Sequence, residues 1–168
     1  ICHVLDNLNI PDAKFILLTR FEHYNNEQET VKWIKSNYKV EFVMIDKLTE
    51  GAACTVLHAH RLINNDTPLL IANSDQIVDM DISEYINDSK KRGLDGSVLC
   101  FEDNDKKWSY AKLDKNRFIT EIREKEVISK NATVGIYYFN KGRDFVENAI
   151  DMICLLYTSP SPRDRSLS

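Results

Sequence analysis

Short apolar runs alternate with segments of helical spacing along the first half of the chain. The runs at residues 14–19, 40–45 and 68–72 are rich in residues that favour strands, and each is bounded by polar residues. Between them, apolar residues recur at helical spacing over residues 27–37 and 52–63. Strands that alternate with single helices pair in parallel, because a parallel crossover needs about a dozen residues. We therefore expect a Rossmann-like first half.

The second half of the chain has a different order of predicted elements. After a predicted helix at residues 82–92, four strand candidates follow with only polar connections between them. They span residues 96–102, 109–114, 118–124 and 132–139. Lys115 and Asn116 predict a tight hairpin turn between the second and third of these strands. We expect a mixed or antiparallel arrangement that ends in a helix from about Arg143.

The composition changes after residue 153. Residues 154–168 are rich in Ser, Pro and Arg and resemble the translation of a transposase-type sequencing adapter. A natural Ser/Pro/Arg tail is the alternative, since such runs are common in linkers. We expect a partial domain over residues 1–153 and a non-native tail over residues 154–168 that takes no part in function.

Overall composition narrows the class of protein. With 43% hydrophobic and 29% charged residues in 168 positions, the chain is typical of roughly one soluble globular domain. No apolar run approaches the ~20 residues that span a bilayer. The net charge of −4 and the lack of a basic cluster argue against nucleic acid as a partner. Cys2, Cys54 and Cys100 lie far apart, which predicts thiols in a reducing, cytoplasmic compartment and no zinc site.

The apolar run at residues 68–72 ends abruptly in the sequence Asn-Ser-Asp-Gln at residues 73–76. Open α/β sheets bind ligands beyond the carboxyl ends of their strands, so Asp75 is a candidate ligand-binding carboxylate. Mg²⁺ prefers one or two carboxylates together with phosphate oxygens and water, and Asp75 suits that role. Asp79 and Asp81 fit better as part of the cap of the helix from residue 82.

Two further positions are candidates for binding. Gly51 and Ala52 form a small-residue turn before a helix, where backbone amides can face a polar ligand, although such turns are equally common without one. Glu124 and Lys125 lie at a predicted strand end, where an ammonium group can bind phosphate. A solvated surface pair is the alternative interpretation for Glu124 and Lys125.

Five segments taken in order resemble the sugar-phosphate nucleotidyltransferases. They are residues 48–53, 71–76, 110–114, 122–125 and 132–139. The similarity runs over residues 4–153. Glucose-1-phosphate thymidylyltransferases are the best-known members, and bacterial capsule and lipopolysaccharide loci contain many relatives.

The resemblance implies a three-layer α/β/α core of GT-A-like type that binds a nucleoside triphosphate and a sugar phosphate or similar small phosphate. The acceptor phosphate would attack the α-phosphorus with Mg²⁺ as cofactor, and pyrophosphate would leave. Such an enzyme is expected to be cytoplasmic, without nucleic-acid partners or membrane spans, and a homo-oligomer is compatible with it. Its products would be precursors of surface polysaccharide.

The resemblance also assigns roles to individual residues. Asp75 would bind Mg²⁺ and act in catalysis together with Lys125. The nucleotide would be bound by Gly51, Ala52 and Ser74. The sugar phosphate would be bound by Glu124, Gly135 and Tyr137. The chain departs from the family pattern at Glu126, where a proline usually follows Glu124 and Lys125. This departure leaves the acceptor open.

Two elements of the family are expected to lie outside this sequence. The glycine-rich phosphate loop belongs before residue 1, and the second metal-binding acid belongs after residue 153. The sequence therefore predicts an internal fragment of an enzyme. A GT-A glycosyltransferase is one alternative, although residues 73–76 offer one acid where those enzymes have Asp-x-Asp. A non-catalytic nucleotide or sugar-phosphate binding domain is another.

We predict that the isolated chain releases no pyrophosphate from a nucleoside triphosphate and a panel of sugar 1-phosphates, because the glycine-rich loop that would hold the triphosphate is expected to lie outside this sequence. A coupled pyrophosphate assay measures this. Turnover at the rate of a full-length relative would contradict the prediction.

Overall fold

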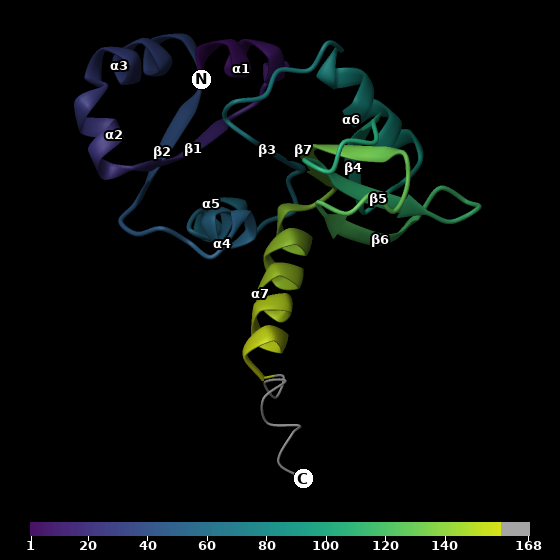
Figure 1. Ribbon diagram of the computed structural model, residues 1–168. Helices are drawn as coiled ribbons and strands as arrows, with labels where there is room; N and C mark the ends of the chain where they lie inside the picture. The colour runs from purple at the N-terminus through teal and green to yellow at the C-terminus, as the bar shows by residue number, and fades with distance from the viewer. Residues whose placement is uncertain (159–168) are drawn as a thin grey trace. The chain divides into compact units, whose positions relative to one another are not determined.

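A computed structural model describes residues 1–158 of the chain. The chain forms two compact units, which are treated separately below (Figure 1). The parallel unit comprises Pro11–Leu69 and residues 141–158, and the mixed-sheet unit comprises Ile1–Ile10 and Leu70–Asn140. Helices and both kinds of strand pairing are present, so the predicted mixed α/β class is confirmed. Within residues 1–158, no helix is both long enough and apolar enough to cross a membrane.

The parallel unit contains the first predicted strands. β1 (Phe15–Arg20) and β2 (Val40–Ile45) pair in parallel over their whole length. α3 (Gln28–Asn37) connects them and buries Val31 and Ile34, as its apolar spacing predicted. Parallel pairing through a helical crossover is confirmed for these two strands.

A short helix, α2 (Phe21–Asn26), precedes α3 and was not predicted. It buries none of its residues, so its sequence shows no apolar periodicity. Its first residue follows directly on β1, and Tyr24 contacts Phe42 of β2 edge-to-face. Contact with the sheet, which involves residues distant in sequence, therefore stabilises this helix.

The prediction of one continuous helix over residues 52–63 is wrong. The segment forms α4 (Ala52–Leu57) and α5 (His60–Ile63), separated by a turn. The His58 N–H donates to Thr55 and the Ala59 N–H to Val56, both with the tighter three-residue spacing. The imidazole of His60 contacts the Leu57 carbonyl at 3.0 Å in this turn.

α7 (Gly142–Thr158) begins against the connection that follows α5. The Gly142 N–H donates to the Thr67 carbonyl at 2.9 Å, and Arg143 pairs with Asp66 at 3.0 Å. A side chain at residue 142 would overlap the Ile63 carbonyl, so the close approach requires glycine. The predicted helix start at about Arg143 is confirmed.

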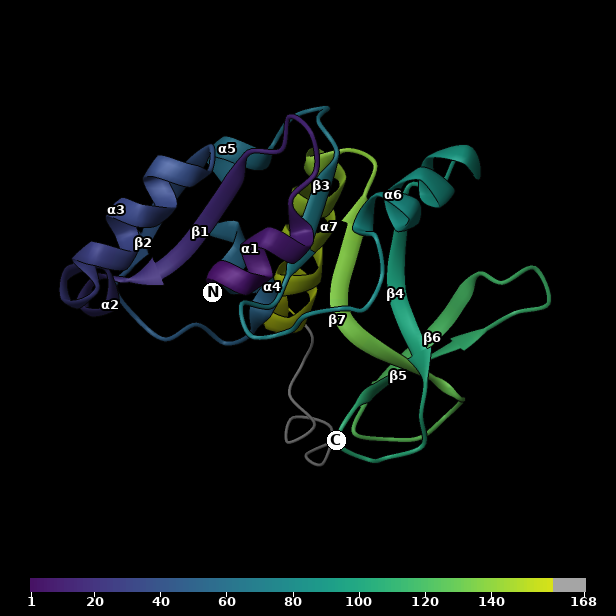
Figure 2. The ribbon, with the colours of Figure 1, turned by 90° about the horizontal axis from the view of Figure 1, so that it is seen from above.

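The mixed-sheet unit contains the remaining strands. They are β3 (Leu69–Ala72), β4 (Gly96–Glu102), β5 (Ser109–Leu113), β6 (Ile119–Glu124) and β7 (Asn131–Phe139). The strand order is β3-β7-β5-β6, and β4 also pairs with β7. Figure 2 shows β7 between β3 and β4. The β4–β7, β5–β6 and β5–β7 pairings are antiparallel, so the predicted mixed or antiparallel arrangement of the second half is confirmed.

The core of this unit lies where β5 and β7 meet. Tyr110 lies opposite Ala132 across the two strands, and both are fully buried. α6 (Ile82–Lys91) packs on β4 through a hydroxyl network in which Ser97 contacts the buried Ser89 and donates to Tyr85. The predicted helix at residues 82–92 is confirmed, with its end one residue earlier.

The predicted roles of two turns are also confirmed. The Asp81 carboxylate accepts from the Ser83 N–H at 2.9 Å and caps α6, and the Ser83 hydroxyl, which donates to the same oxygen, lowers the pKa of Asp81. In the β5–β6 hairpin, the Asp114 carboxylate accepts from the N–H groups of Asn116 and Phe118. This capping holds Arg117 at a left-handed φ of 67°.

Candidate functional site

The turn after β3 places the candidate metal ligand. β3 ends at Ala72, and Ser74 and Asp75 form the turn directly beyond it, both exposed. The Asn73 amide donates to the Gln76 side-chain oxygen at 3.0 Å, which closes the turn from Asn73 to Gln76 on itself. The apolar run therefore delivers an exposed carboxylate at its end, as predicted.

Gly135 of β7 lies against this turn. Its φ of +83° belongs to the left-handed region that favours glycine. A Cβ at this position would overlap the Asn73 amide and would lie 2.9 Å from the Gln76 side-chain oxygen. Conformation and contact both require glycine, and the structure thereby brings predicted acceptor residue Gly135 next to the turn that contains Asp75.

A second contact holds the far side of the turn. The Asn7 amide donates to the Val78 carbonyl at 2.8 Å, and the Val78 N–H donates to the Asn7 side-chain oxygen at 2.9 Å. Asn7 belongs to α1 (Cys2–Leu8), an element that was not predicted. The chain is thus held on both sides of Asp75, by Gly135 and by Asn7.

Glu124 ends β6 and Lys125 follows it. Their side chains are 77% and 71% exposed and form a loose ion pair at 3.6 Å. The Lys125 backbone N–H donates to the Trp108 carbonyl at 3.0 Å, while its φ of 56° is left-handed. A non-glycine residue in this region is uncommon, and such conformations concentrate at functional sites.

The sheet register relates Lys125 to Gly135. Tyr110 of β5 lies opposite both Ala132 of β7 and Arg123 of β6. β6 and β7 are each antiparallel to β5, so they run in the same direction. Lys125 and Gly135 both follow this row of residues in chain order, and they therefore lie on the same side of it, two strands apart.

Tyr137 and the Gly51–Ala52 pair occupy different settings. Tyr137 is half-buried in β7 and lies opposite Val98 of β4. Gly51 and Ala52 are exposed at the start of α4 in the parallel unit. Gly51 has a φ of 143°, and a Cβ there would meet no atom within 4 Å. The glycine is therefore required by its backbone conformation, and the space beside it is open.

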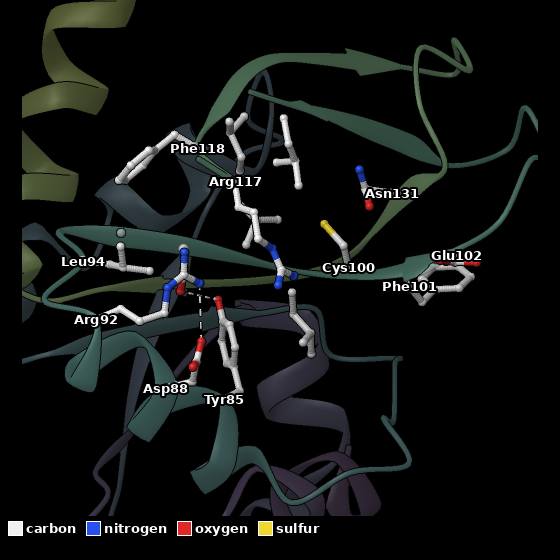
Figure 3. A pocket seen from close by; sticks show the side chains of 16 residues that line it. Tyr85, Asp88, Arg92, Leu94, Cys100, Phe101, Glu102, Arg117, Phe118 and Asn131 are labelled. Atoms are coloured by element: carbon white, nitrogen blue, oxygen red, sulfur yellow. Dashed lines mark hydrogen bonds and ion pairs between the residues drawn. The ribbon is translucent and has the colours of Figure 1, made fainter. Parts of the chain in front are cut away.

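A separate cavity of about 500 Å³ lies in the mixed-sheet unit between α6, β4 and the β5–β6 hairpin (Figure 3). Arg92 and Arg117 point their guanidinium groups into it, and Arg92 pairs with Asp88 at 3.4 Å. Burial raises the pKa of Tyr85 to about 12 and raises the pKa of the Cys100 thiol. Both groups therefore stay protonated at neutral pH, and neither offers a nucleophile.

We predict that Gly135→Ala destabilises the fold by about 2 to 4 kcal/mol, since it adds left-handed strain to an overlap with Asn73. Urea denaturation measures the loss. Gly96→Ala in β4 is the control, because its Cβ would come no closer than 3.3 Å to any atom. Adding Asn73→Ala to Gly135→Ala should recover part of the loss. Equal stability of the two glycine variants would contradict the predicted contact.

Solved structures share this fold. A Bacillus anthracis protein assigned as a glucose-1-phosphate thymidylyltransferase and crystallised with sucrose is 22% identical, with a TM-score of 0.69 over 96% of this chain and 62% of its own. A nucleoside-diphosphate-sugar pyrophosphorylase from Vibrio cholerae is 21% identical, with a TM-score of 0.66 over 90% and 62%. HddC from Yersinia pseudotuberculosis is 18% identical, with a TM-score of 0.64 over 87% and 63%.

These likenesses show a Rossmann-like nucleotidyltransferase fold, as predicted. The chain spans about 62% of the length of the first two structures. A comparison with curated protein sequences finds no match. The sequence itself matches the family described as nucleotidyl transferase over residues 3–151, and the chain therefore belongs to that family.

Proposed function

We propose that this chain forms part of an enzyme that transfers a nucleoside monophosphate from a nucleoside triphosphate to a sugar phosphate, for surface polysaccharide synthesis. The observation that supports this most is the fixed Asn73–Gln76 turn, which presents Asp75 at the end of β3 beside Gly135. The family match covers both elements. The names of the Bacillus and Vibrio proteins concern sugar nucleotides, which agrees with a sugar phosphate as acceptor.

Asp75 would hold Mg²⁺ in this enzyme. Among residues 1–158, no group of three or more His, Cys, Asp or Glu side chains could hold a metal ion by itself. A single exposed carboxylate on a fixed turn nevertheless fits Mg²⁺, which completes its coordination with phosphate oxygens and water. When bound, the ion would supply positive charge to the phosphate oxygens. A protein-only metal cage is not required for that role.

Ser74, Gly51 and Ala52 would contact the nucleotide. Ser74 shares the turn with Asp75 and is exposed. The open space beside Gly51 and the small Ala52 side chain allow a base to approach the backbone at this point. Thr55 supports the turn, because its hydroxyl and its N–H both donate to the Gly51 carbonyl.

Glu124 and Lys125 would bind the sugar phosphate. An exposed ammonium group is a point charge that suits a phosphate, and the Trp108 carbonyl fixes the Lys125 backbone. Gly135 and Tyr137 of β7 would border the acceptor. A half-buried Tyr137 presents part of its ring, while Gly135 leaves no side chain in the way.

In the reaction, an acceptor phosphate oxygen forms a bond to the α-phosphorus and the bond to the β-phosphate breaks, so pyrophosphate leaves with its electron pair. No protein atom enters a covalent bond. The contribution of the chain is to bring two polyanions together and in line, which positioned cations and backbone groups accomplish. Lys125 acts in this way by offsetting the charge of the acceptor phosphate.

We predict that Asp75→Asn abolishes metal binding at the β3 turn. Mn²⁺ added with a nucleoside triphosphate should broaden the amide NMR signals of residues 73–76, because paramagnetic broadening detects even weak occupancy without turnover. Asp79→Asn is the matched control, since Asp79 is also exposed and lies four residues further on. Broadening that survives in Asp75→Asn would refute the metal assignment.

We predict that Lys125→Asn weakens binding of a sugar 1-phosphate about tenfold, because a charge-assisted contact of about 1.4 kcal/mol is lost. Asparagine tolerates the left-handed backbone, so the change removes the charge without adding strain. Isothermal titration with a panel of sugar 1-phosphates measures the effect. Lys115→Ala in the hairpin turn is the control, and an equal loss in both variants would argue for a non-specific charge effect.

A further inference from the structure

We infer that β6 is an interface through which two copies of this chain associate, by antiparallel pairing of their β6 strands about Ile122. β6 ends the strand order of the mixed-sheet unit, so in the described part of the chain its outer edge faces no strand. Ile122 is 48% exposed on this edge. The inference rests on β6 alone and is independent of the proposed enzymatic function.

Backbone geometry identifies the groups at the open edge. The Lys125 N–H donates inward to Trp108 of the neighbouring chain segment. Inward and outward groups alternate along an antiparallel strand, so Arg123 and Glu121 also direct their backbone groups toward β5. Ile122 and Glu124 therefore direct their N–H and C=O groups outward, where a second strand can bond to them.

The order of the charged residues along β6 then favours one register for its pairing with β6 of a second copy. With Ile122 opposite Ile122 of the second copy, each Glu121 lies opposite an Arg123. These two residues occupy non-hydrogen-bonded positions, where opposing side chains are closest. Within one copy, Arg123 already pairs with Glu121 at 2.7 Å, so association would join two ion pairs into a network of four charges.

The neighbouring registers are unfavourable. Moving the second copy by two residues in one direction places Glu121 opposite Glu121, and the other direction places Arg123 opposite Arg123. In the second case Glu121 would face Lys125, but Lys125 lies beyond the end of β6 and its φ of 56° takes it out of the ladder. Like charges directly opposite each other destabilise a sheet. Charged residues commonly protect edge strands from pairing, but here their order excludes the wrong registers and permits one self-complementary register.

Ile122 is the exposed apolar residue at the centre of the paired segment, and a second copy would cover part of it. The regular part of the strand is short, because the ladder with β5 is irregular between Lys112 and Leu113. An interface of this size is small, so the association is expected to be weak and concentration-dependent.

Sedimentation velocity over about a hundredfold range of protein concentration tests the inference. The unchanged chain should shift from monomer to dimer. Glu121→Arg leaves the edge with two cations and Arg123→Glu leaves it with two anions, so each variant should dimerise about tenfold more weakly or worse. A chain that stays monomeric throughout, with its edge left for a strand of another protein, would overturn the inference.

Mixing the two variants distinguishes contact between copies from effects within one copy. In an equimolar mixture, the cationic edge faces the anionic edge, and native mass spectrometry should detect the heterodimer at the affinity of the unchanged chain. A variant that merely failed to fold would not recover on mixing. If the mixture associates no better than either variant alone, the proposed register is wrong.

Ile122→Pro supplies a second measurement that depends on the backbone. It removes an outward N–H, and proline is tolerated on edge strands in that orientation. Dimerisation should be lost while the melting temperature changes little. Ile122→Ala keeps the N–H and should retain most of the association, and identical behaviour of the two variants would argue against pairing through the strand edge.

Discussion

The lack of a side chain at Gly135 allows β7 to approach the turn that follows β3, and the candidate site depends on this contact. The Asn73 and Gln76 side chains fill the space that a Cβ at residue 135 would occupy. They also bond to each other at 3.0 Å, so Asp75 lies in a turn that is closed by its own neighbours. The packing therefore holds the two residues that flank Ser74 and Asp75, and the Asp75 carboxylate extends from a turn whose ends are fixed.

Arg117 and Lys125 have a left-handed backbone conformation, and each lies where the chain of the mixed-sheet unit changes direction. Arg117 is held in the β5–β6 hairpin by the Asp114 cap, and Lys125 leaves β6 with its N–H bonded to Trp108. The two conformations differ in what supports them. Asp114 caps a turn, which explains Arg117 structurally, whereas Lys125 lies at a strand end with an exposed ammonium group, a setting that suits ligand binding.

The strands could be predicted from the sequence to within a residue or two, because each depends on a local run of apolar or β-forming residues. α2 could not, since it buries no residue, and the spacing of apolar residues does not reveal the break between Leu57 and His60, where the hydrogen bonds tighten to three-residue spacing. The exposed position of Asp75 beyond the end of β3 was predictable from the abrupt end of the apolar run. The clamp between Asn7 and Val78 joins positions 71 residues apart, and no local pattern indicates such a contact.

Two pairs of charged residues lie on β6 and at its end, and we assign a different role to each pair. Glu121 and Arg123 hold the charges that set the register of self-association, whereas Glu124 and Lys125 lie at the strand end where a sugar phosphate would bind. In the favoured register, Glu124 lies opposite Thr120 of the second copy, so the paired segment would end next to Lys125, the residue proposed to bind the sugar phosphate. Asp75 follows β3, which is three strands away from β6 in the sheet order, so the proposed pairing of β6 does not involve it.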